Sequence, residues 1–103
     1  MESERRRAPR FQFIADAEVV EIQTGTKLKA KTGDLSSGGC FLDMLNPSPQ
    51  GTEVQITIVR ENGTFTGIGR VIVVFPNLGM GVAFTSSAQT AILERWLQEL
   101  KLA

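Results

Sequence analysis

Two short stretches of the chain carry side chains suited to binding an anion. The first is an arginine cluster near the N-terminus, formed by Arg5, Arg6, Arg7 and Arg10. The second is the segment 34–39, which reads Asp-Leu-Ser-Ser-Gly-Gly and so offers a carboxylate, two hydroxyls and two glycines. Guanidinium groups form forked, charge-assisted hydrogen bonds with phosphate oxygens. Glycines let backbone N–H groups approach a ligand without a Cβ in the way.

The same two stretches suit a guanine base. Guanine presents O6 and N7 as acceptors on one edge, which match arginine, and N–H donors on the other edge, which match the Asp34 carboxylate. We therefore predict that folding brings the arginine cluster onto segment 34–39, where together they bind a small anionic guanine nucleotide.

Composition sets the limits within which such a site must form. The chain has 103 residues, 42% of them hydrophobic and 21% charged, which predicts one globular domain with a single core. The net charge is zero, so the clustered arginines concentrate positive charge locally in a chain that is neutral overall. No apolar run approaches the roughly 18 residues of a membrane helix, and no secretory signal is recognised. With Cys40 as its one cysteine, the chain is expected in the cytoplasm.

The residue types that are missing exclude several kinds of catalysis. The chain has no His, no Tyr and a single Cys, so catalytic triads, histidine acid–base chemistry and Cys/His zinc sites lack their groups. We therefore expect a binding protein rather than an enzyme, with no catalytic residue, no metal site and no catalytic cofactor.

Alternating apolar residues predict the strands that position the two stretches. A first strand begins at Phe11, with a bulge or a change of buried face near Val19 to Val20, where the alternation breaks. The segment 34–39 is expected as a turn between the second and third strands, and Asn62-Gly63 as a hairpin turn. The six expected strands cover 11–22, 27–32, 40–44, 54–58, 64–75 and 80–84.

The C-terminal segment predicts a helix over residues 87–100. Ser86 and Gln89 resemble a capping box, and apolar residues from Ile92 to Leu100 recur at helical spacing. Short strands followed by one helix predict a mainly β fold, a six-stranded antiparallel barrel closed at one end by the helix with Trp96 as its anchor. Residues 1–10 are expected as a flexible basic arm, and 11–103 as one barrel domain.

In this context the motifs resemble the PilZ domain, a bacterial receptor module for cyclic di-GMP. Arg6 and Arg10 match the family's Arg-x-x-x-Arg motif, and Asp34, Ser36 and Gly39 match its Asp/Asn-x-Ser-x-x-Gly motif. The segment 79–84, Gly-Met-Gly-Val-Ala-Phe, and the closing helix are also similar to PilZ domains. The resemblance covers nearly the whole chain.

The resemblance implies a function and a set of ligand contacts. Arg6 and Arg10 would contact phosphate and guanine, whereas Asp34, Ser36, Gly38 and Gly39 would form the base side of the site. An arginine at position 5 is associated with two stacked ligand molecules, so we expect two cyclic di-GMP per protomer. Ligand would order the arm and create a surface for an unidentified effector protein. We expect a monomer or a weak homodimer.

Other interpretations stay open. A small barrel with a basic arm could bind nucleic acid, but the aromatic residues fall mostly at core positions, which counts against stacking on bases. A PilZ-like adaptor could also act through protein contacts without a ligand. Lys27, Lys29 and Lys31 could be only the solvated face of a strand, and the apolar stripe 92–100 could be a dimer face. Cys40 is expected to be a core residue.

Overall fold

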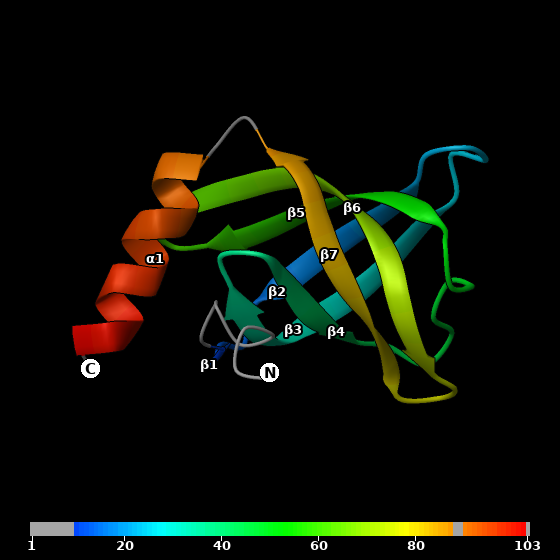
Figure 1. Cartoon of the computed structure of the whole chain (residues 1–103), viewed down its shortest axis with the longest axis horizontal. Helices are drawn as coiled ribbons and strands as arrows, with labels where there is room; N and C mark the ends of the chain where they lie inside the picture. The colour runs from blue at the N-terminus through cyan, green and yellow to red at the C-terminus, as the bar shows by residue number, and fades with distance from the viewer. Residues whose placement is uncertain (1–9, 88–89, 103) are drawn as a thin grey trace, which may run out of the picture.

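The chain folds into a closed antiparallel β-barrel with a helix across one end (Figure 1). This computed structural model describes residues 10–87 and 90–102. The elements are β1 (Phe11–Gln12), β2 (Asp16–Glu21), β3 (Lys27–Ser36), β4 (Gly39–Asp43), β5 (Glu53–Arg60), β6 (Gly63–Phe75), β7 (Gly79–Ser87) and α1 (Thr90–Leu102). Strands β3-β2-β5-β6-β7-β4 are neighbours in that order, and β4 pairs back with β3 to close the barrel. The expected six-stranded antiparallel barrel is confirmed, with β1 as one extra short strand.

Alternation of apolar and polar residues produces the core, because successive side chains of a strand point to opposite faces. In β5, Val54, Ile56 and Ile58 are fully buried, and the residues between them are exposed or half-buried. The expected hairpin from β5 to β6 is present, but its two turn residues are Glu61 and Asn62, one position before the expected Asn62-Gly63, and Gly63 pairs with Arg60. The core is therefore filled by one face of every long strand.

The expected first strand is interrupted, and its irregularity lies at residues 13–15 instead of near Val19. Gln12 pairs with Asp34 and Asp16 pairs with Lys31, so three residues on this strand face two on β3. The pairing of β2 runs without a break through Val19 and Val20, so the bulge predicted there was wrong.

Thr32 explains where the strand breaks. Its hydroxyl, which is fully buried, donates to the Phe13 carbonyl and accepts from the Ala15 N–H at 2.9 Å. These bonds give partners to the Phe13 carbonyl and the Ala15 N–H, which in an unbroken strand would pair with the backbone of the neighbouring strand. The extra residue turns Ile14 outward, where it is 68% exposed.

Strand β3 extends further than the sequence predicts. It runs to Ser36, so only Ser37 and Gly38 separate it from β4. Asp34 and Ser36 were expected in a turn, and they lie instead in a strand paired with β1 and β4. The β3–β4 register shifts between Thr32 and Asp34, which changes the direction of the strand just before the motif.

Helix α1 covers the open end of the barrel near β1 (Figure 1). Trp96 is fully buried and its ring lies 5.5 Å from that of Phe13, as expected for an anchoring residue. The helix begins at Thr90, whereas the expected N-cap, Ser86, lies in β7 and pairs with Ile68. No helix within residues 10–87 and 90–102 is long and apolar enough to cross a membrane.

Candidate functional site

Strand pairing brings Arg10 to Asp34. Phe11 and Gln12 form β1, which runs antiparallel to the end of β3 and pairs with Leu35 and Asp34. Arg10 immediately precedes this strand, and its Nη1 lies 3.5 Å from Asp34 Oδ2. The Arg10 side chain is 61% exposed, so the guanidinium remains open to a ligand. The two halves of the motif predicted from sequence therefore meet through these two residues.

The Asp34 carboxylate has one free oxygen. Oδ2 receives the Arg10 guanidinium, whereas Oδ1 is buried and has no hydrogen-bond partner among residues 10–87 and 90–102. A buried acceptor without a donor is costly, since it has lost water and gained nothing in its place. Within the part of the chain that the structure describes, the site thus contains an acceptor that lacks a donor.

Ser36 organises the turn after β3. Its hydroxyl donates to the Gly39 carbonyl at 3.3 Å and accepts from the Gly38 N–H at 3.2 Å. A serine hydroxyl has one proton to donate. In this structure that proton is used within the turn, so a hydrogen bond from Ser36 to a phosphate would require the hydroxyl to rotate.

The two glycines of the turn have different surroundings. A Cβ on Gly39 would lie 2.2 Å from the Val82 carbonyl oxygen, so the close approach of β7 requires glycine there. A Cβ on Gly38 would meet no heavy atom of the described residues within 4 Å. Packing thus accounts for Gly39, whereas Gly38 leaves open surface beside Asp34 and Ser36.

Cys40 lies beneath the site and is chemically inert. It is buried and pairs with Leu35 across β3 and β4. Burial, together with the nearby Asp34 carboxylate and against a lowering by Arg10, raises the pKa of the Cys40 thiol to about 12. The thiol is therefore protonated at neutral pH, in agreement with the expected role as a core residue.

A groove that the sequence reasoning missed adjoins this site. It has a volume of about 320 Å³ and lies between α1 and the end of the barrel that carries β1 and the β3–β4 turn. Its walls are formed by Phe11, Ser37, Glu94, Leu97, Gln98 and Lys101. The helical spacing of the last four was visible in the sequence, but the direction of that face follows only from the docking of α1.

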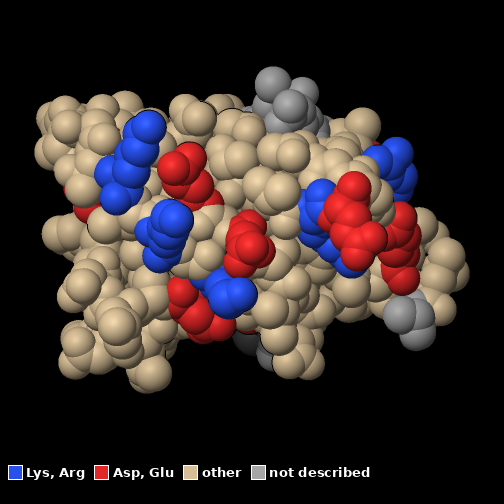
Figure 2. Space-filling model, turned by 180° about the vertical axis from the view of Figure 1, so that it is seen from behind, with Lys and Arg blue, Asp and Glu red and all other residues tan. Residues whose placement is uncertain are grey.

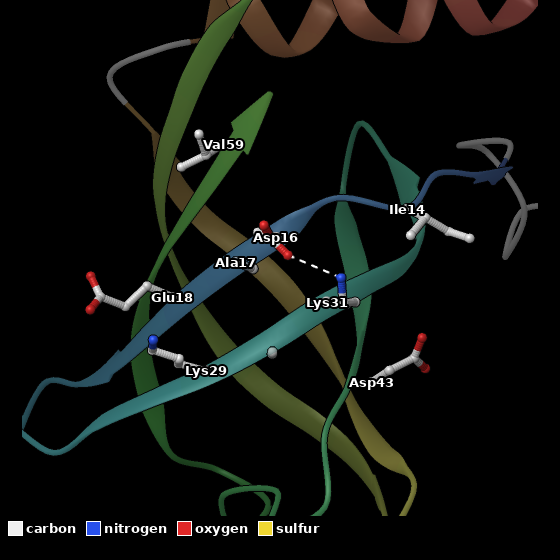
Figure 3. A pocket seen from close by; sticks show the side chains of 9 residues that line it. Ile14, Asp16, Ala17, Glu18, Lys29, Lys31, Asp43 and Val59 are labelled. Atoms are coloured by element: carbon white, nitrogen blue, oxygen red, sulfur yellow. Dashed lines mark hydrogen bonds and ion pairs between the residues drawn. The ribbon is translucent and has the colours of Figure 1, made fainter. Parts of the chain in front are cut away.

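A second hollow lies on the outer face of β2 and β3 (Figure 3). Its charged side chains come from β2, β3 and the end of β4, and Lys31 Nζ lies 3.2 Å from Asp16 Oδ1. Figure 2 shows acidic and basic side chains interspersed over the face that it draws, without a patch of one sign. This favours the interpretation of the β3 lysines as a solvated strand face and disfavours a nucleic-acid track there.

Two arginines of the predicted site, Arg5 and Arg6, lie outside the described residues. The structure therefore places Arg10, Asp34, Ser36, Gly38 and Gly39 together at one end of the barrel and makes no statement about the other two. Within residues 10–87 and 90–102, no cluster of three potential metal ligands occurs.

Comparisons with known proteins agree with this architecture. A family model described as PilZ domain matches residues 4–100. The PilZ domain of Escherichia coli YcgR, solved with c-di-GMP, is similar with a TM-score of 0.76 and 18% identity, covering 94% of this chain and 92% of that one. The PilZ domain of CeSA from a cellulose-synthesizing bacterium gives 0.71 and 22%, covering 90% and 98%.

A longer protein, the Bacillus subtilis inhibitor of motility MotI/DgrA, has a TM-score of 0.77 and 15% identity. That match covers 95% of this chain and 51% of the other, so this chain spans about half of that protein. No curated protein matches the chain in sequence.

Proposed function

This chain belongs to the PilZ domain family, and from that premise we propose that it is a receptor domain for cyclic di-GMP that signals to a partner protein. The ligand would bind beside the β3–β4 turn, between the arginine motif and Asp34. The proposal assigns binding, and no catalytic step, to these residues.

The observation that carries the proposal is the pairing of Arg10 with an Asp34 carboxylate that has one buried oxygen free. Arg10 Nη1 lies 3.5 Å from Oδ2, and no described residue donates a hydrogen bond to Oδ1. Guanine N–H groups are donors of the kind that Oδ1 lacks. The guanidinium of Arg10 suits a phosphate oxygen or the acceptor edge of the base. A cyclic dinucleotide with guanine bases offers all of these groups in one molecule.

The ion pair would not hinder ligand entry. Arg10 and Asp34 are 61% and 30% exposed, and an exposed ion pair contributes only about 0–1 kcal/mol. A hydrogen bond to a charged group contributes about 1.5–3 kcal/mol. Arg10 can therefore exchange part of its contact with Asp34 for a phosphate at little cost.

In this proposal, Arg5 and Arg6 complete the site from the N-terminal side. Ligand would draw residues 5–10 over the turn, with Arg6 and Arg10 on phosphate and guanine, and Arg5 supporting a second stacked cyclic di-GMP. Ordering such a segment costs about 1–2 kcal/mol per residue, so we expect a dissociation constant of about 1 μM or weaker. The ordered segment and the turn would then form the surface that an effector protein recognises.

Isothermal titration calorimetry with cyclic di-GMP tests the proposal. We expect saturable heat for the intact chain and a loss of about ten- to a hundredfold in affinity for Arg10→Ala. Arg70→Ala is the matched control, because Arg70 pairs with Glu53 on another part of the barrel. Absence of heat with the intact chain, or equal affinity for Arg10→Ala, would contradict the proposal. A stoichiometry of one would reject the second ligand alone.

A further inference from the structure

The groove between α1 and the β3–β4 turn has a wall of polar side chains without partners. Glu94, Leu97, Gln98 and Lys101 are spaced three, four and seven residues apart, so they share one face of α1. Among residues 10–87 and 90–102, the side chains of Glu94, Gln98 and Lys101 form no hydrogen bond or ion pair with one another or with any neighbour.

The other polar residues of the helix differ in this respect. Arg95 donates to the Asn62 carbonyl at 3.3 Å, and Glu99 lies 3.9 Å from Arg60. These contacts join α1 to the β5–β6 hairpin. The helix thus uses one polar face to attach to the barrel and leaves the groove face unpaired.

The position of the groove connects it to the proposed ligand site. Phe11, on one wall, directly follows Arg10, and Ser37 lies between the motif residues Ser36 and Gly38. A ligand whose phosphate contacts Arg10 would therefore have its adjoining groups beside this groove. The volume of about 320 Å³ lies at the lower end of the range found for small-molecule sites.

The side chains that line the groove favour a neutral group over a phosphate. Glu94 and Lys101 carry opposite charges, so the groove as a whole does not attract anions. Glu94 and the Gln98 carbonyl accept hydrogen bonds, whereas Lys101 and the Gln98 amide donate them. Phe11 and Leu97 add apolar surface, and aromatic rings stack well on bases. A guanine base has this combination, with two apolar faces, a donor edge and an acceptor edge.

We propose that the groove binds one guanine base of the ligand, with Glu94 and Gln98 on its N–H edge and Lys101 on its O6/N7 edge. This inference rests on the proposed function and assigns the selection of this one base to α1, with the other base left to Asp34. Adenine has an amino donor where guanine has O6, and a ring acceptor where guanine has N1–H. Glu94 would therefore favour guanine over adenine, since a carboxylate can accept two adjacent hydrogen bonds from N1–H and the amino group of guanine, whereas adenine offers it only the N6 amino group.

Titration of the full chain with cyclic di-GMP and with cyclic di-AMP tests this assignment. We expect Glu94→Gln and Gln98→Ala each to weaken cyclic di-GMP binding about tenfold. Glu94→Gln should leave cyclic di-AMP binding unchanged, so the ratio of the two affinities falls. Glu18→Gln and Lys27→Met, on the β2–β3 hairpin, are the matched controls and should leave both affinities unchanged.

Each outcome of the titrations decides between the two proposals. If Arg10→Ala abolishes binding while Glu94→Gln and Gln98→Ala retain the affinity and the nucleotide preference of the intact chain, α1 has no part in base selection and this inference is wrong. If the intact chain binds no cyclic di-GMP, the proposed function fails and this inference fails with it. Urea unfolding of each variant checks that a loss of affinity is not caused by a loss of stability. Substitution of these exposed side chains is expected to leave the stability unchanged.

Discussion

Arg10 and Asp34, 24 positions apart in the sequence, lie 3.5 Å apart because β1 pairs with the end of β3. The pairing depends on the extra residue between Gln12 and Asp16, which sets β1 one position out of register with β2. Without that shift, neither the arginine nor the buried carboxylate oxygen would have its present place. The irregular segment 13–15 is thus part of the site even though it contains none of the motif residues.

The role of Thr32 in holding segment 13–15 can be tested with Thr32→Val. This change keeps the shape of the side chain but leaves the Phe13 carbonyl and the Ala15 N–H without their hydroxyl partner. We expect a loss of about 1–3 kcal/mol in the free energy of unfolding, measured with urea. We also expect weaker cyclic di-GMP binding, because β1 and Arg10 lose their fixed position. Thr66→Val, in the middle of β6, is a control for the loss of a threonine hydroxyl elsewhere. Unchanged stability and affinity in Thr32→Val would show that the break in the strand does not depend on this hydroxyl.

Replacement by alanine should destabilise the protein at Gly39 and leave its stability unchanged at Gly38. In Gly39→Ala the new methyl group would lie 2.2 Å from the Val82 carbonyl oxygen, which must move. We expect this variant to lose about 1–3 kcal/mol of stability or more, as for other overpacked positions. Gly38→Ala meets nothing within 4 Å and should fold as stably as the parent, so it is the matched control. Equal urea midpoints for the two variants would contradict the packing role of Gly39.

How far the sequence predicts this fold is clear from individual strands. Val54, Ile56 and Ile58 alternate regularly, and the hairpin that joins β5 to β6 forms within one residue of its expected place, because local preference and burial agree there. The break at residues 13–15 could not be predicted, because Phe13 and Ala15 continue the alternation and only the buried hydroxyl of Thr32, far along the chain, selects the irregular form.

Part of the site could likewise be predicted from the local sequence, whereas another part depends on contacts between distant residues. Arg10 and Asp34 were identified by residue type and motif spacing. The groove face of α1 was not, because Glu94, Gln98 and Lys101 have the pattern of any solvated helix face. The contacts of Leu93 and Trp96 with the barrel end decide which polar face lies beside the turn.

The raised pKa of Cys40 predicts a loss of stability in alkali. The thiol of the unfolded chain ionises with a pKa of about 8.5. Burial, with a further contribution from Asp34, raises the pKa in the folded protein to about 12. Between these values the folded state binds more protons, so stability falls as pH rises, by at most about 1.4 kcal/mol per pH unit from this group. Cys40→Ala should therefore lose less stability than the parent between neutral pH and pH about 11. Parallel curves of unfolding free energy against pH would contradict this.

The central claim is that Arg10 and Asp34 contact the same ligand. Nuclear magnetic resonance can follow the Nε–H of Arg10 and the side-chain carboxyl carbon of Asp34 in a single titration with cyclic di-GMP. We predict that both resonances shift and that they saturate along one binding curve, because one molecule engages both groups. A ligand that saturates the protein while either resonance stays at its original position would contradict the claim.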